Sequence, residues 1–224
     1  MSADNTLQAV CWDLDGTLID SERYWIDSEY ALVAEFGGTW SEQLAAAVIG
    51  SSLDRTAAHL ISAGVALPVD EVITRISSAV AQRVITDGVP WRPGVQQLLA
   101  HLHEQGIPQA MVTMSYADNA QRVARASGDL FDVVVSGDLV SRGKPDPEPY
   151  LRAIAQLGVA PERSVAFEDS VPGLTSATSA GLTTVVVPCV APIEPADHFT
   201  LWPSHEGITI DDLNALLTQR TTHA

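Results

Sequence analysis

The alternation of apolar and polar stretches along the chain predicts an α/β fold. Short apolar, β-branched runs are typical of strands at residues 9–14, 109–113, 133–136, 164–168 and 183–188. Amphipathic stretches between and after these runs predict helices at residues 94–105, 117–127, 147–157, 171–180 and 211–217. Nearly continuous apolar strands that alternate with helices are typical of a parallel sheet covered on both faces. We therefore expect a doubly wound, Rossmann-like core.

The segment 21–87 interrupts this alternation. It contains no convincing strand pattern, and its helical stretches are separated by glycine-containing breaks such as Phe36-Gly37-Gly38. We therefore predict an all-helical insertion at 21–87 between two parts of the core, residues 1–20 and 88–224.

Composition narrows the classes of partner. The 224 residues are 46% hydrophobic and 18% charged, which is typical of a folded protein. The formal net charge is −16, so a role in coating nucleic acid or an anionic membrane is not expected. No apolar run reaches the roughly 20 residues of a membrane span, the N-terminal residues carry no basic charge, and there are only two cysteines. These features predict a cytoplasmic protein.

Two carboxylates, Asp13 and Asp15, stand at the end of the first predicted strand. On an extended backbone, residues two positions apart share a face, so both side chains are expected to point into one place. Like charges repel there, and a compensating cation or a shared proton is needed. Asp-x-Asp-Gly alone is a weak signal, because it also occurs in ordinary turns and in calcium loops.

Polar groups also follow the next three predicted strands. Thr113 and Met114 follow the second strand and could bind a phosphoryl oxygen, and Glu168 and Asp169 close the fourth. The loop after the third strand carries Lys144, the only lysine beside eleven arginines. Ligands of open parallel sheets bind beyond the carboxyl ends of the strands, and all four groups are expected at that edge.

Four ordered motifs resemble those of the haloacid dehalogenase-like phosphotransferases, in particular the phosphoglycolate phosphatase and β-phosphoglucomutase branch. The matching segments are DLDGTLIDSE (13–22), VTMS (112–115), GKPDP (143–147) and EDS (168–170) with the later Gly173. The helical insertion 21–87 lies where this family has its cap domain. The resemblance covers essentially the whole core.

The resemblance implies a role for each motif. Asp13 would attack phosphorus and form an aspartyl-phosphate, and Asp15 would protonate the leaving group and then activate water. Thr113, the Met114 N–H and Lys144 would bind the transferring phosphoryl group. Mg²⁺ would be held by Asp13, the Asp15 carbonyl and Asp169, with Glu168 either as a ligand or behind the ligands. The implied reaction is hydrolysis of a small phosphorylated metabolite.

Other reactions of the family fit less well. Dehalogenases characteristically lack the second aspartate, which is present here as Asp15, and the Schiff-base phosphonatases need a lysine in the cap. A β-phosphoglucomutase-type reaction stays open, although Trp25 stands where those mutases have a histidine. A non-catalytic binding protein of the same fold is the remaining alternative. Arg55 and Ser21 are candidate substrate contacts, while the substrate and the oligomeric state are not predicted.

Overall fold

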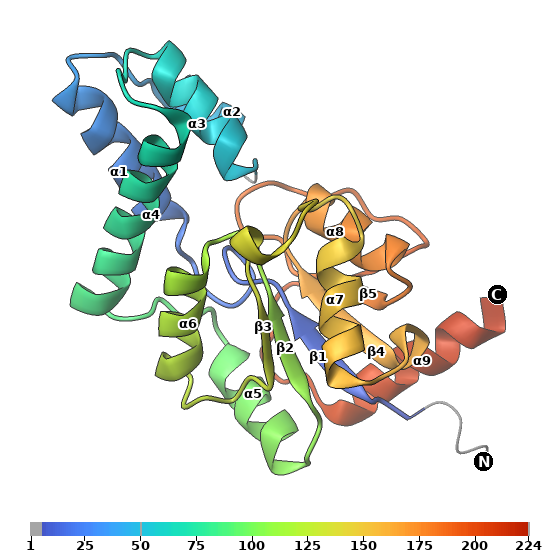
Figure 1. Cartoon of the computed structure of the whole chain (residues 1–224). Helices are drawn as coiled ribbons and strands as arrows, with labels where there is room; N and C mark the ends of the chain where they lie inside the picture. The colour runs from blue at the N-terminus through green and yellow to red at the C-terminus, as the bar shows by residue number, and fades with distance from the viewer. Residues whose placement is uncertain (1–5, 50, 224) are drawn as a thin grey trace.

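The computed structural model describes residues 6–49 and 51–223 and confirms the predicted α/β core (Figure 1). One parallel sheet has the strand order β3-β2-β1-β4-β5-β6 in this part of the chain. Its strands are β1 (Ala9–Trp12), β2 (Gln109–Val112), β3 (Val133–Val135), β4 (Ser164–Glu168), β5 (Thr183–Val186) and β6 (Thr200–Leu201). Residues 1–5 and 224 of the predicted core and position 50 of the predicted insertion lie outside the described residues.

Helices cover both faces of the sheet. One face packs against α5 (Val95–Glu104), α6 (Ala117–Ala126) and α9 (Ile210–His223), and the other against α7 (Glu148–Leu157) and α8 (Val171–Ser179). Alternate residues of β1 divide between the two cores: Val10 and Trp12 face the first set of helices, and Cys11 faces the second. Two 3₁₀ turns, Gly137–Leu139 and Pro161–Arg163, complete the core.

The predicted strands, and all predicted helices except the last, are confirmed to within two residues. The last helix, expected at residues 211–217, spans Ile210–His223, because residues 218–223 are polar and do not continue the apolar pattern. Two other differences stand out. The first strand ends at Trp12 and not at residue 14, because the Leu14 carbonyl accepts the N–H groups of Leu18 and Ile19 in a tight turn. Asp13 and Asp15 therefore do not share an extended strand. The two-residue strand β6 was not predicted, since it is too short to show an alternating pattern.

The strand order fixes the place of the site. The chain passes from β1 to β2 and β3 on one side, and then returns to β4 on the other side of β1. The carboxyl ends of β1 and β4 are therefore neighbours at the point where the order reverses, which is the usual binding position in such sheets. Asp13 follows β1 there, and Asp169 follows β4.

Residues between β1 and α5 form a lobe of helices beside this sheet edge (Figure 1). The lobe consists of α1 (Glu22–Glu35), α2 (Glu42–Val48), α3 (Leu53–Ser62) and α4 (Val69–Thr86), and its described residues contain no strand. Leu32, Leu60, Val72 and Ile76 belong to an apolar core of its own. Within the described ranges, no helix combines the length and apolar character required to cross a membrane.

Candidate active site

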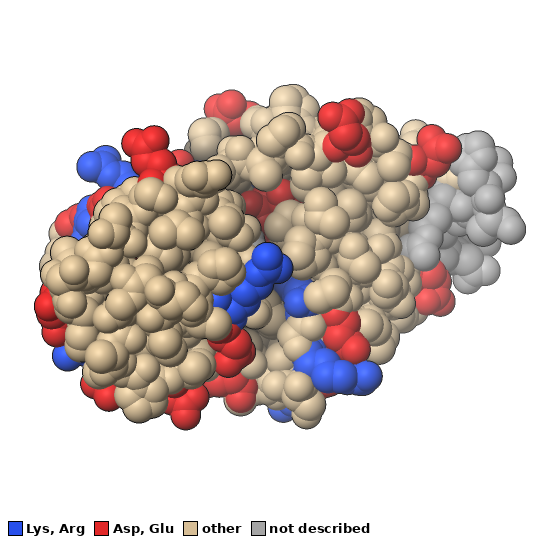
Figure 2. Space-filling model, turned by 90° about the horizontal axis from the view of Figure 1, so that it is seen from above, with Lys and Arg blue, Asp and Glu red and all other residues tan. Residues whose placement is uncertain are grey.

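A cavity of about 630 Å³ lies between the helical lobe and the carboxyl edge of the sheet. Asp13, Asp15, Thr113, Lys144 and Asp169 line it from the core, and residues of α1, α2 and α3 line it from the lobe. Seen from above, a groove separates the two lobes, with acidic side chains in its depth and basic ones across it (Figure 2). The four sequence motifs therefore meet at one cavity.

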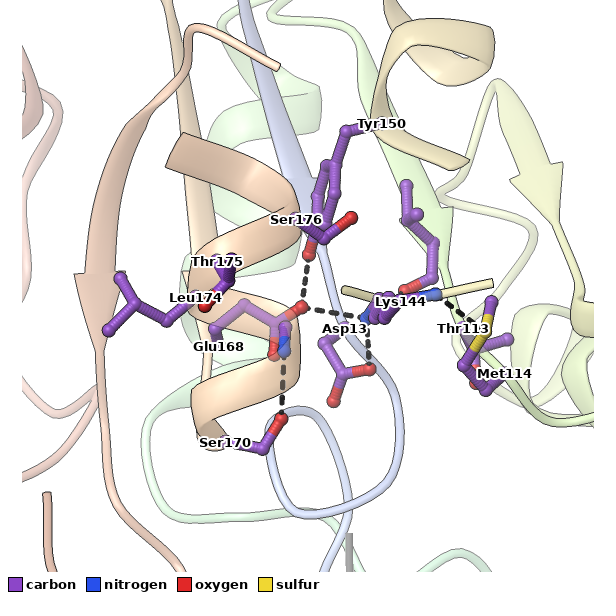
Figure 3. A network of polar contacts seen from close by, with 12 residues as sticks. Asp13, Thr113, Met114, Lys144, Tyr150, Glu168, Ser170, Leu174, Thr175 and Ser176 are labelled. Atoms are coloured by element: carbon purple, nitrogen blue, oxygen red, sulfur yellow. Dashed lines mark hydrogen bonds and ion pairs between the residues drawn. The ribbon is translucent and has the colours of Figure 1, made fainter. Parts of the chain in front are cut away.

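Lys144 forms the centre of a buried polar network (Figure 3). Its Nζ lies 2.7 Å from Asp13 Oδ1, 2.7 Å from Glu168 Oε1 and 2.9 Å from the Val112 carbonyl oxygen. An ammonium group has three protons, so these contacts use all of them. Burial works to lower the pKa of Lys144, but Asp13 and Glu168 outweigh it and raise the pKa above its ordinary value. The lysine is charged and held in place.

Glu168 is fully buried behind this lysine. Its Oε1 accepts the Tyr150 hydroxyl at 2.5 Å in addition to Lys144 Nζ, and Tyr150 is itself fully buried. Burial raises the pKa of Glu168 to about 7, although Lys144 opposes this. Glu168 does not line the cavity, so its contact with Lys144 favours a place behind the direct ligands. Sequence reasoning missed Tyr150, because a tyrosine on an amphipathic helix is indistinguishable from a core residue.

We expect Tyr150→Phe to lower the free energy of unfolding by about 2 kcal/mol, since a buried carboxylate oxygen loses one of its donors. Denaturant titration measures the change. Tyr30→Phe is the matched control, because the Tyr30 ring is half-buried and its hydroxyl has no hydrogen bond to other described residues. Equal effects of the two substitutions would contradict a specific role of the Tyr150 hydroxyl.

Three donors fix the carboxylate of Asp15. Ser21 Oγ and Trp25 Nε1 lie 2.5 and 3.0 Å from Oδ1, and Ser115 Oγ lies 2.6 Å from Oδ2. Ser21, a candidate substrate contact, is fully buried, and the structure does not bring it to the cavity wall. Ser115 lies 100 positions from Asp15 in the sequence, and no local pattern marks this contact.

Asp169 completes the acidic part of the site. One carboxylate oxygen from each of Asp13, Glu168 and Asp169 lies within 4.8 Å of the other two, a spacing that could hold a metal ion. Burial, followed by the charges of Asp13 and Glu168, raises the pKa of Asp169 well above its ordinary value. A Cβ atom at Gly16 would lie 2.0 Å from Asp169 Oδ2, so only glycine permits this close approach. Asp13 Oδ2 is buried and has no hydrogen-bond partner among the described residues.

The remaining candidates lie around this centre. Thr113 lines the cavity, and its Oγ1 accepts the Ser115 N–H at 2.9 Å. Met114 also lines the cavity, and its sulfur accepts the Lys144 N–H at 3.2 Å. Arg55 is an exposed residue of α3 that lines the cavity from the helical lobe. The structure therefore brings every predicted site residue except Ser21 and Glu168 to the cavity wall.

Comparison with known proteins agrees with this geometry. A family model described as haloacid dehalogenase-like hydrolase matches residues 7–181. Protein CbbY of Rhodobacter capsulatus is 33% identical over 95% of this chain and 96% of its own. The phosphorylated carbohydrates phosphatase of Thermotoga maritima is 32% identical over 79% of this chain and 82% of its own. Hexitol phosphatase A of Escherichia coli is also 32% identical, over 79% of this chain and 81% of its own.

A crystal structure of CbbY from Rhodobacter sphaeroides, in complex with xylulose-1,5-bisphosphate, superimposes with a TM-score of 0.83. The two sequences are 26% identical, and the match covers 90% of this chain and 96% of the other. The uncovered tenth of this chain is shorter than the helical lobe, so the match extends beyond the core into that lobe.

Proposed function

The chain belongs to the haloacid dehalogenase-like hydrolases, and from this premise we propose that it is a Mg²⁺-dependent phosphatase of a small phosphorylated, sugar-like metabolite. One observation carries the proposal: the carboxylate of Asp13 lies in the cavity 2.7 Å from a buried ammonium group, with Asp15 fixed in the same cavity. This supplies a carboxylate nucleophile and a separate proton carrier.

The proposed reaction has two steps. An oxygen of Asp13 attacks phosphorus, the bond from phosphorus to the ester oxygen breaks, and Asp15 transfers a proton to the departing alkoxide. Asp15 then takes a proton from water, whose oxygen attacks phosphorus and releases phosphate from Asp13. The hydrogen bonds from Ser21, Trp25 and Ser115 fix the direction of the Asp15 carboxylate for both proton transfers.

Lys144 and Thr113 are the proposed phosphoryl contacts. All three Nζ protons of Lys144 are already used by the protein, so a phosphoryl oxygen has to share or replace the bond to Asp13. Such an exchange is consistent with the reaction, because the carboxylate of Asp13 loses its negative charge as it bonds to phosphorus. Lys144 then neutralises charge on the phosphoryl oxygens.

The donor atoms fit a magnesium ion. Asp13 has a buried oxygen without a partner among the described residues, and Gly16 leaves room for Asp169 to approach the turn after β1. We propose that Asp13, the Asp15 carbonyl and Asp169 hold the ion, since Mg²⁺ prefers oxygen ligands. When bound, it supplies positive charge that lets a phosphate dianion approach the carboxylates. Glu168 orients Lys144 from behind.

The helical lobe is proposed to act as the cap, residues 21–87, over a core of 1–20 and 88–224. It contributes the cavity wall opposite the sheet edge and thereby contacts the part of the substrate that is not transferred. A phosphomutase of β-phosphoglucomutase type is less compatible with the site. The Trp25 indole donates its N–H to Asp15, and an indole nitrogen donates only, so it cannot shuttle a proton.

A screen of phosphorylated metabolites with Mg²⁺ tests the proposal. We expect free phosphate as the product, and at least a hundredfold loss of rate in excess EDTA that added Mg²⁺ restores, since the ion offsets the negative charge of the site. Phosphate release and isomer formation are measured in parallel. Accumulation of an isomeric sugar phosphate would show a mutase, and full turnover in EDTA would contradict the metal site.

A further inference from the structure

Helix α1 presents two glutamates to the cavity. Glu22 and Glu29 both line it, and they are seven positions apart, which places them about two turns apart on one face of the helix. Neither takes part in the proposed phosphoryl transfer. Burial is the main cause that raises the pKa of each to about 7.

Glu29 is the less usual of the two. The residue is 4% exposed, and its Oε2 accepts the Trp40 indole N–H at 3.2 Å. Its other oxygen has no hydrogen-bond partner, and no lysine or arginine pairs with it, among residues 6–49 and 51–223. Because Glu29 lines the cavity, this oxygen is available to a hydrogen-bond donor of a ligand.

The charge balance of the cavity restricts that ligand. Among the described lining residues, five carboxylates face two basic groups, Lys144 and the exposed Arg55. Lys144 is already paired with Asp13 and Glu168. Another part of the lining, residues 190–193, is apolar and offers no cation. The proposed Mg²⁺ ion would offset the carboxylates at the sheet edge, which leaves Glu22 and Glu29 facing Arg55 alone on the lobe side. A second anionic group of a substrate would meet repulsion from these two glutamates, whereas hydroxyl groups would find acceptors.

We propose that the face of α1 selects substrates whose part beyond the phosphoester is uncharged and rich in hydroxyl groups, and that Glu29 determines this specificity. The inference rests on the proposed phosphatase function, and it adds which chemical groups the substrate carries at the end away from the phosphoester. Glu29 accepts a hydrogen bond from a substrate hydroxyl through Oε1, while Trp40 holds Oε2. The volume of about 630 Å³ accommodates a chain of several carbons beyond the phosphate.

Matched substrate pairs test this inference. Each pair differs only at the far carbon, a primary alcohol against a carboxylate: glycerol 3-phosphate with 3-phosphoglycerate, erythritol 4-phosphate with 4-phosphoerythronate, and glucitol 6-phosphate with 6-phosphogluconate. We expect the alcohol to have at least a tenfold higher kcat/KM at the best chain length. Glu29→Gln should narrow this ratio at least fivefold, because an amide keeps the contact with Trp40 but removes the negative charge.

Two further variants complete the design. Glu22→Gln should also narrow the ratio of kcat/KM between alcohol and carboxylate. It replaces Glu29→Gln as the test variant if Glu29→Gln does not fold. Glu42→Gln removes the same charge from an exposed residue of α2 and should leave the ratio unchanged.

The outcomes separate the inference from the function. Preference for the carboxylates overturns the inference, and so does an alcohol-to-carboxylate ratio that a folded Glu29→Gln variant leaves unchanged. So does hydrolysis of p-nitrophenyl phosphate without turnover of any of the alcohols. If p-nitrophenyl phosphate is not hydrolysed either, the proposed function itself fails.

Discussion

Asp13→Asn is expected to lower kcat/KM by at least about a thousandfold, because an amide cannot form the acyl-phosphate bond on which the proposed reaction depends. The substitution should leave the fold intact. Asparagine has the size of aspartate, and its carbonyl oxygen still accepts the hydrogen bond that Lys144 Nζ donates at 2.7 Å. Phosphate release measures activity, and denaturant titration measures the free energy of unfolding.

Asp20→Asn provides the matched control. Asp20 is exposed, lies seven positions from Asp13 and is not part of the cavity lining. Asp20→Asn removes the same negative charge, so a general effect of making the net charge less negative than −16 would appear in both variants. Activity of Asp13→Asn close to that of Asp20→Asn would refute Asp13 as the nucleophile. A large loss of stability would indicate a structural role instead.

The fold and the composition of the site were predictable for different reasons. Strand β4 follows from a continuous apolar run because it is buried on both faces, and helix α5 follows from apolar residues spaced along one buried face. The positions of Asp13, Lys144 and Asp169 follow from topology. Residues that close parallel strands meet at one edge, whatever their distance along the chain.

The contacts within the site were not predictable in the same way. Ser115 binds Asp15 across 100 positions of sequence, and Tyr150 binds Glu168 from a helix whose pattern reports only burial. Both contacts depend on the packing of two elements and on side-chain direction, which periodicity does not encode. Glu29 belongs to the same class, since its place on α1 reaches the cavity only through the docking of the helical lobe.

Turn geometry explains the error at the first strand. The predicted strand included Leu14, the apolar residue after Asp13, yet the chain turns after Asp13 because Gly16 adopts a φ of +88°. The two carboxylates still reach one cavity, as predicted, but by a turn and not by strand alternation. A glycine that allows positive φ two residues after a predicted strand end is the signal that could have indicated this turn.

Lys144→Met is expected to lower the free energy of unfolding by about 3–5 kcal/mol in the absence of Mg²⁺, and kcat/KM by about a hundredfold or more. The side chain of Lys144 is 5% exposed, and its removal leaves Asp13 and Glu168 buried without their shared cation. Lys144→Arg should not restore activity. Three acceptors at 2.7–2.9 Å surround one nitrogen, and a planar guanidinium cannot present its donors to them from a single atom.

Arg142→Met is the control that distinguishes the specific contacts of Lys144 from the loss of one positive charge. Arg142 belongs to the same loop, but its side chain is 71% exposed and pairs with Asp146 and Glu148 at the surface. Exposed pairs contribute little, so we expect a loss below about 1 kcal/mol and nearly unchanged kcat/KM. Lys144→Met and Arg142→Met each remove one positive charge from the same loop, but of these two residues only Lys144 contacts Asp13. Equal losses would therefore attribute the effect to net charge, whereas a large difference assigns it to the three contacts of Nζ.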